Sequence, residues 1–422
     1  MRFLVSIVLA VVLHATAQSD ERTIVKAGRL VDSISGKVLR DQTIVISGDR
    51  IVSTGKAGVA ETGARVIDLS DYTVMPGLID MHVHLTGDHR YHGYKRLELS
   101  IPRQTLHGAT NAGIMLQAGF TSGRNVGAAG FGDVALRDAI NAGEIDGPRL
   151  RVSGPSLGIT GGHCDNNLLP PSYDKRAEGV ADGPWAVRAK VRENIKYGAD
   201  LIKYCATGGV LSKGDSVGGP QYTLEEMQAI IDEAHMHGRK VAAHAHGAEG
   251  IRRAIVAGVD SIEHASLIDD EGIRLAKKNG TFLVMDVYND TFILEHGAKV
   301  GMLPESLEKE RQIGQLQRDN FRKAFEKGAR MAFGSDAAVY PHGDNGKQFA
   351  YMVQYGMTPM QAVQAATIHA AELIGWPDDV GAVEAGRYAD IIAIEGDPLA
   401  DLSLFENVAF VMKGGKVYKT DN

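Results

Sequence analysis

The chain has 422 residues, of which 44% are hydrophobic and 23% are charged. This composition supports a large core and excludes a mainly disordered protein. The net charge of −7, without any basic block, argues against nucleic acid and anionic membranes as partners.

The first 17 residues have the pattern of a secretory signal peptide. Arg2 gives a short basic start, residues 3–13 are almost wholly apolar, and residues 15–17 form an A-x-A cleavage site. The apolar stretch is too short to span a bilayer in the mature protein, although an uncleaved anchor is the alternative. We expect an exported chain, periplasmic or secreted, that begins near Gln18 and has no membrane partner in its mature form.

Two β-rich segments lie at the ends of the chain. Residues 18–74 and 377–422 are rich in β-branched side chains and carry glycine-containing turn signals that are typical of hairpins. Neither segment alone buries much apolar surface. We expect them to form one small composite β-sandwich domain that flanks the rest of the molecule.

Residues 75–376 repeat one pattern: an amphipathic helix, a glycine and a short apolar strand. In one complete unit, Thr223 and Glu226 match a capping box, Gly238 ends the helix, and residues 241–246 form the strand. Repeated alternation predicts the α/β class, and eight strands over about 300 residues fit a closed (β/α)8 TIM barrel. The predicted strands end near His84, Arg124, Leu157, Lys203, His246, His264, Asp286 and Asp336.

Side chains of metal-binding type occur late in several of these strands. His82 and His84 are two residues apart in an extended run, so their imidazoles face the same side. A barrel gathers the carboxyl ends of its strands at one rim. The other candidates are Lys203, His244, His246, His264 and Asp336. A single histidine in an apolar strand is usually a satisfied core residue, but so many unpaired buried polar groups would be costly, and the set predicts a metal site.

Lys203 determines how many metals we expect. An ammonium group in an apolar strand beside a dication is disfavoured by both burial and charge repulsion. A neutral amine can react with carbon dioxide to give an anionic carbamate, whose two oxygens can bridge two metals. The alternative is a lysine whose ammonium group reaches solvent at the rim. We expect a carbamate on Lys203 and two divalent metal ions, with zinc as the default for nitrogen and oxygen ligands.

The chain resembles the amidohydrolase superfamily over nearly the whole mature sequence. The segments that carry the resemblance are residues 76–84, Lys203 with residues 206–210, His244, residues 262–264, residues 334–336 and the tail from 386 to 415. Residues 161–163 and 243–247 are similar to the imidazolonepropionase-related branch. That branch includes Xaa-Pro and Xaa-Arg/Lys dipeptidases and the ochratoxin-degrading amidohydrolases.

The resemblance implies a role for each of these residues. The ligands would be His82, His84 and Asp336 for the more buried metal, His244 and His264 for the more exposed one, and the carbamate of Lys203 for both. His246 and His163 would be catalytic groups that orient or polarise the scissile carbonyl. Asp336 would also shuttle a proton from a metal-bridging water or hydroxide to the leaving nitrogen.

The implied activity is hydrolysis of the C–N bond in a small amide with a free carboxylate. Such a substrate is a dipeptide, an N-acyl amino acid or an ochratoxin-like amide. One alternative is a cyclic-amide hydrolase of imidazolonepropionase type, but Lys203 argues against its one-metal site. Another is an inactive scaffold of the same fold, which would have lost ligands that this chain retains. Related enzymes often form homo-oligomers, frequently octamers, so we expect a homo-oligomer.

Three further residues receive weaker expectations, and one pair of cysteines stays open. Cys164 and Cys205 are the only cysteines; export would permit a disulfide, but two cysteines fix no geometry, and an unbridged pair is the simpler expectation. Arg124 and His342 lie near strand ends and are interpreted as solvated loop residues. Asp80 shares the inward orientation of the histidines and is a candidate for supporting the ligands.

Overall fold

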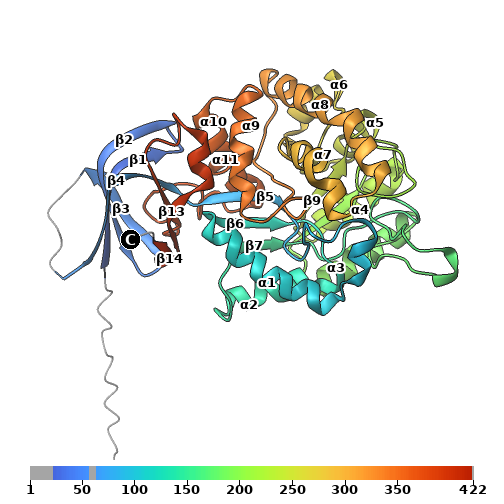
Figure 1. Cartoon of the computed structure of the whole chain (residues 1–422), viewed down its shortest axis with the longest axis horizontal. Coiled ribbons are helices and arrows are strands. Elements are labelled where there is room, and N and C mark those ends of the chain that lie inside the picture. The colour runs from blue at the N-terminus through green and yellow to red at the C-terminus, as the bar shows by residue number, and fades with distance from the viewer. Residues whose placement is uncertain (1–21, 57–62, 421–422) are drawn as a thin grey trace, which may run out of the picture.

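The computed structural model describes residues 22–56 and 63–420, and the predicted signal peptide lies outside these ranges. Figure 1 shows a curved β-sheet at one side of a larger body in which helices surround a set of strands. The two ends of the described chain meet in the curved sheet, whereas the central part of the chain forms the larger body.

The curved sheet has seven strands drawn from both ends of the chain. They are β1 (Arg22–Asp32), β2 (Lys37–Ser47), β3 (Arg50–Lys56), β4 (Arg65–Pro76), β12 (Ile391–Glu395), β13 (Val408–Lys413) and β14 (Lys416–Thr420). Their order is β14-β13-β12-β4-β1-β2-β3, so the antiparallel pair of β4 and β12 joins the two chain ends. Only β1 and β4 pair in parallel, which makes the sheet mixed.

This sheet curls on itself around a core of its own. Ile44 of β2 and Phe410 of β13 belong to the same buried apolar cluster although their strands lie in opposite halves of the sheet. The loop between β2 and β3 meets the opposite half, because Ala389 donates a hydrogen bond to the carbonyl of Asp49 at 2.8 Å. The β-branched residues that marked both ends in the sequence therefore bury one another.

The larger body is the predicted parallel barrel. One of its sheets contains β5 (Leu78–Val83), β6 (Phe120–Asn125) and β7 (Arg149–Val152); the other contains β8 (Leu201–Cys205), β9 (Lys240–Ala245), β10 (Ser261–His264) and β11 (Phe282–Val284). Isolated parallel bridges join the two sheets. Leu157 pairs with Tyr204 at one junction, and at the other Met331 pairs with Leu283 while Ala337 pairs with Val83. Residues 331–337 thus occupy the position of the eighth strand through single bridges instead of a continuous ladder.

The helices cover the outside of the barrel. They are α1 (Ile101–Gln117), α2 (Gly132–Asn141), α3 (Pro184–Lys196), α4 (Leu224–Met236), α5 (Ala248–Ala257), α6 (Asp270–Asn279), α7 (Asn289–Val300), α8 (Pro304–Glu326), α9 (Gln348–Gln354), α10 (Pro359–Ala365) and α11 (Ile368–Ile374). The capping box predicted for α4 is confirmed, since Thr223 and Glu226 bond each other's backbone N–H groups. None of the helices within the described residues is long and apolar enough to cross a membrane.

Candidate metal centre

A cavity of about 790 Å³ opens at the carboxyl ends of the barrel strands. Its wall contains all eight site residues predicted from the sequence: His82, His84, His163, Lys203, His244, His246, His264 and Asp336. They come from separate strands and loops, and the barrel brings them together because all its strands end on the same side.

The first group of ligand-type atoms lies where β5 meets the eighth-strand position. The Nε2 atoms of His82 and His84 lie 3.2 and 3.3 Å from the same oxygen, Oδ1 of Asp336. Each imidazole also has a partner at Nδ1. Nδ1 of His82 lies 3.0 Å from Glu263 Oε2, and Nδ1 of His84 lies 3.4 Å from the carbonyl oxygen of Gly127. These partners leave both Nε2 atoms directed toward Asp336.

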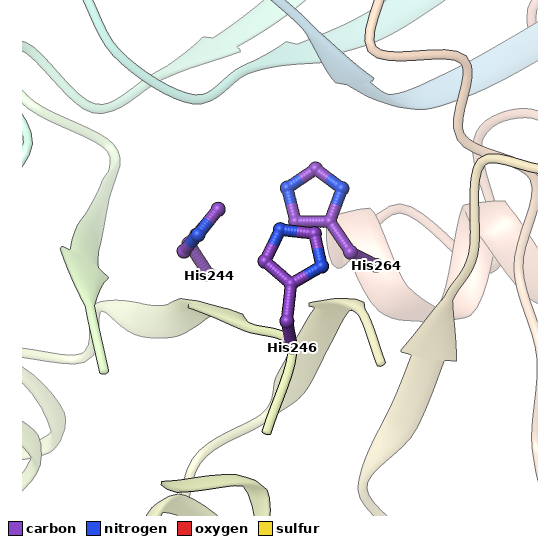
Figure 2. Close-up of side chains that lie close together, drawn as sticks. All are labelled: His244, His246 and His264. Carbon is purple, nitrogen blue, oxygen red and sulfur yellow. The ribbon is translucent and has the colours of Figure 1, made fainter. Parts of the chain in front are cut away.

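The second group consists of His244, His246 and His264, whose rings converge in Figure 2. One nitrogen from each ring lies within 4.8 Å of the others. Nδ1 of His264 lies 2.8 Å from Asp286 Oδ1, and Nδ1 of His246 lies 2.7 Å from Ser266 Oγ. The structure places His246 directly beside the other two, and its assignment to the substrate instead of a metal stays a prediction.

Lys203 lines the same cavity as both groups. It is the third residue of β8, its side chain is buried, and no described residue accepts a hydrogen bond from its amine. Burial lowers the pKa of Lys203 to about 8, against the opposing effect of Glu263 and Asp336. The charge of Lys203 in turn contributes to the low pKa of His244.

The two groups fit divalent cations. Their donors are imidazole nitrogens and a carboxylate, which suit zinc and its neighbours. His244 Nε2 is buried and has no hydrogen-bond partner among the described residues, a costly state that coordination would relieve. The groups are adjacent, since the ring centroids of His82 and His264 are 4.9 Å apart.

The backbone is strained at two of these positions. His264 has a φ of 69° and Asp336 a φ of 56°, both in the left-handed region. Such residues cost roughly 1–3 kcal/mol each and persist where the surrounding structure fixes them. Asp336 is fixed by its N–H, which donates to the carbonyl of His82 at 2.7 Å. Backbone strain thus occurs at two of the ligand-type residues.

Comparison with known proteins agrees with this geometry. The sequence profile of the amidohydrolase family matches residues 73–418. The chain belongs to the amidohydrolase family. It is a hydrolase that acts on C–N bonds, and members of this family generally use divalent metals.

Individual relatives cover almost the whole of this amidohydrolase. The ochratoxinase of Aspergillus niger is 34% identical over 434 aligned positions, which cover 96% of this chain and 88% of that protein. The crystal structure of a Xaa-Pro dipeptidase with bound methionine has a TM-score of 0.89 and 41% identity, covering 94% of this chain and 100% of that one. A prolidase complexed with N-methylphosphonate-L-proline has a TM-score of 0.89 and 32% identity, covering 95% and 100%. The predicted family and barrel fold are confirmed.

Two buried carboxylates of this amidohydrolase received no role from the sequence. Glu263 contacts His82 Nδ1 and also accepts a hydrogen bond from Arg124 at 2.7 Å, while Asp286 contacts His264. Burial alone would raise the pKa of Glu263, but Arg124 and His82 hold it below its usual range. The sequence did contain a signal for both carboxylates. Glu263 directly precedes His264, and Asp286 ends a predicted barrel strand, at the same level as the ligand-type residues.

Arg124 and His342 were interpreted as solvated loop residues, and both interpretations are wrong. Arg124 is 3% exposed because its guanidinium reaches across the barrel interior to Ser261 and Glu263. His342 is also buried, beside the cavity residues, and burial lowers its pKa to about 4. Asp80 is buried as well, and it accepts hydrogen bonds from the backbone N–H groups of His82 and Ser335, so it supports the chain that carries the ligands.

A disulfide joins Cys164 to Cys205, which corrects the expectation of an unbridged pair. The loop that follows the third barrel strand folds back over the end of β8, and this brings the two Cα atoms to 6.0 Å despite 41 residues of separation. That approach depends on the barrel and could not be read from two isolated cysteines. The bridge anchors the loop that carries His163.

His163 packs against the second group. Its ring stacks on that of His244 with centroids 4.0 Å apart and 13° between the planes. Nδ1 of His163 lies 2.8 Å from Ser212 Oγ, and that hydroxyl lies 2.6 Å from Asp215 Oδ1. The carboxylate can only accept, so Ser212 donates to Asp215 and accepts from His163. His163 therefore carries its proton on Nδ1 and has a free lone pair on Nε2.

Proposed function

We propose that this amidohydrolase uses two metal ions to hydrolyse the amide bond of a small substrate that has a free carboxylate. The substrates we propose are dipeptides, N-acyl amino acids and ochratoxin-like amides, in keeping with the similarity to a Xaa-Pro dipeptidase, a prolidase and an ochratoxinase. The observation that carries the proposal is the buried Lys203 in the cavity that two converging groups of ligand-type atoms also line. A one-metal cyclic-amide hydrolase would not need that lysine.

Six residues would hold the metals. His82, His84 and Asp336 fit one ion, His244 and His264 fit the other, and a carbamate formed on Lys203 by carbon dioxide would contact both. When bound, the two ions lower the pKa of water and polarise the amide carbonyl. Zinc is the metal we propose, because the donors are nitrogen and oxygen.

Asp336 would move the proton. Burial raises its pKa, but His82 and His84 hold the carboxyl well below its usual range, so it is ionised and able to accept a proton from water. Nδ2 of Asn289 donates to Asp336 Oδ2 at 3.1 Å and fixes the carboxylate in the cavity. The same carboxyl group would then deliver the proton to the leaving nitrogen.

His163 and His246 would orient the substrate. Both line the cavity beside His244, and each is fixed through Nδ1 by a serine hydroxyl, Ser212 for His163 and Ser266 for His246. A ring that is held in one orientation places its other nitrogen reproducibly against the substrate. We propose that these nitrogens contact the scissile amide.

The cellular setting is also a proposal. We propose export to a periplasm or beyond, followed by cleavage near Gln18, because the first residues match a signal peptide. The bridge between Cys164 and Cys205 supports this proposal, since disulfides persist mainly in oxidising compartments. We further propose a homo-oligomer that binds neither nucleic acid nor membrane in its mature form, in keeping with the net charge of −7.

A substrate panel tests the proposed activity. The zinc-loaded protein is assayed with Xaa-Pro and other dipeptides, N-acyl amino acids, an ochratoxin-like amide and imidazolonepropionate, and amide cleavage is followed by chromatography. The proposal predicts turnover of linear amides with a free carboxylate. Turnover of the cyclic amide alone would contradict it.

A further inference from the structure

A chain of hydrogen bonds leads from His163 to an enclosed ion pair. Nδ1 of His163 lies 2.8 Å from Ser212 Oγ, and that hydroxyl lies 2.6 Å from Asp215 Oδ1. The same carboxylate oxygen accepts a hydrogen bond from Lys309 Nζ of α8 at 2.8 Å. The side chains of this ion pair are only 13% and 11% exposed, so both charges are held in place. We call Ser212, Asp215 and Lys309 the His163 relay.

The relay determines which nitrogen of His163 carries the proton. Asp215 pairs with the ammonium group of Lys309, so its carboxylate accepts hydrogen bonds and does not donate. The other close partner of the Ser212 hydroxyl is the carbonyl oxygen of Gly209 at 3.2 Å, which also only accepts. The single hydroxyl proton therefore points to one of these two acceptors, and Ser212 accepts from His163. The imidazole proton lies on Nδ1, and Nε2 keeps a lone pair.

The surroundings of His163 confine its ring. Nε2 of Gln221 donates to Asp215 Oδ2 at 3.1 Å, and Oε1 of Gln221 accepts from the backbone N–H of His163 at 3.0 Å. The backbone of Gly209 lies so close that a methyl group there would be 2.4 Å from His163 Nδ1 and 2.8 Å from His244 Nε2. The ring is thus confined between Gly209 and His244, on which it stacks. Since Ser212 occupies Nδ1, Nε2 is the nitrogen that remains for a ligand in the cavity.

We propose that the relay holds His163 as a hydrogen-bond acceptor and that its Nε2 binds an N–H group of the substrate. The inference rests on the proposed function, in which two cations beside the ring disfavour a second proton on it. A lone pair on Nε2 cannot donate to a carbonyl oxygen, so His163 orients the substrate without polarising its carbonyl. The N–H belongs to the scissile amide or to an amino group on the neighbouring carbon. Ser212 and Asp215 are positioning residues, because they act through His163.

Three small substrates test the acceptor role and separate the two donors. N-acetyl-L-alanine offers only an amide N–H, Ala-Pro offers only an amino N–H, and N-acetyl-L-proline offers neither. We expect His163→Ala to lower kcat/KM by about 10- to 100-fold for the substrate whose N–H is bound, and by no more than about threefold for N-acetyl-L-proline. N-acetyl-L-proline should also be the poorest substrate of the wild type. An equal loss on N-acetyl-L-proline would overturn the inference, because that substrate has no N–H to donate.

A double-mutant cycle tests whether the relay acts through His163. Ser212→Ala should lower kcat/KM about 3- to 10-fold with the same substrate selectivity, and Ser212→Thr, which keeps the hydroxyl, should recover most of this loss. In a protein that already carries His163→Ala, Ser212→Ala should have no further effect. A loss that persists without His163 would overturn the relay, because it would show general damage to the loop. Asp270→Asn is the control, since Asp270 also pairs with a lysine, Lys327 at 2.8 Å, but on the exposed surface.

Two measurements without turnover separate this inference from the proposed activity. Neutron diffraction from crystals of the zinc-loaded wild type in heavy water should show deuterium on Nδ1 of His163 and none on Nε2, and deuterium on Nε2 would overturn the inference. His163→Ala should bind as much zinc as the wild type, whereas a loss of zinc would overturn the inference by making Nε2 a metal ligand. If the wild type hydrolyses none of the three substrates, the proposed function fails, and the deuterium position still decides whether His163 is an acceptor.

Discussion

The floor and the rim of the cavity are built in opposite ways. The floor, which we define as His82, His84, Lys203, His244, His264 and Asp336, consists mainly of side chains held from behind by other buried groups. Glu263 fixes His82 and Asp286 fixes His264. The rim, which we define as Arg96, Lys175 and Arg176, carries positive charge, and no described carboxylate pairs with these side chains.

This difference separates the residues that perform the reaction from those that recognise the substrate. A prearranged floor needs no reorganisation when the substrate arrives, so substitutions there should act mainly on kcat and on metal binding. A rim of exposed charge does not hold the ligands of the floor, so substitutions there should act mainly on KM. Substitutions in the floor and in the residues that support it test this difference.

Asp336→Asn should have the largest effect. The amide cannot act as the proton acceptor, and its loss of charge also weakens the first group of ligands. We expect kcat to fall by about 10³- to 10⁴-fold while the protein stays folded by circular dichroism. Measurable turnover within tenfold of the wild type would refute the role of Asp336 as the proton shuttle.

Lys203→Ala should be rescued by a small molecule. Removing the amine removes the carbamate, and we expect kcat to fall by at least about 100-fold. Acetate or propionate can occupy the vacated space and offer two oxygens, so activity should partly return as their concentration rises. Asp336→Asn is the control, because these acids should not restore it. A fully active Lys203→Ala protein would exclude the carbamate.

Glu263→Gln should weaken metal binding. Its carboxylate holds His82 Nδ1 and compensates the charge of the buried Arg124. Loss of such a supporting carboxylate typically reduces metal affinity by about 10- to 100-fold, which chelator competition would measure. Glu249→Gln is a suitable control, since Glu249 forms only an exposed pair with Arg253. Equal zinc affinities in the two variants would show that the floor does not depend on Glu263.

The Cys164→Ser, Cys205→Ser double variant should have the smallest effect on turnover. The bridge connects β8, which carries Lys203, to the loop that carries His163. We expect a loss of about 2–4 kcal/mol in the free energy of unfolding, measured with denaturant, and a change in kcat/KM of only a few-fold. Dithiothreitol should reproduce the effect in the wild type and leave the double variant unchanged. A stability equal to that of the wild type would show that the bridge does not constrain this loop.

The sequence predicted the residues of the floor more completely than the buried residues that hold them in place. Strand alternation places His82 and His84 on one side, and repeated helices and strands place the later ligand-type residues at the same end of a barrel. These local patterns identified seven residues that line the cavity, and the family resemblance added His163. The eighth strand was also located, although residues 331–337 form only isolated bridges.

The supporting contacts join residues that are far apart in the sequence, so no local pattern predicts them. Arg124 and Glu263 are 139 residues apart in the chain, and only barrel closure makes Arg124 a buried partner instead of a loop residue. The disulfide likewise depends on how one loop folds over β8.

The number of divalent ions bound per chain distinguishes a two-metal centre from a one-metal site. The protein is saturated with zinc, freed of loosely bound metal by gel filtration, and analysed for metal and protein content together. The account predicts two ions per chain in the wild type and fewer in Lys203→Ala. A wild-type protein that retains one tightly bound ion per chain and is fully active would contradict the two-metal centre.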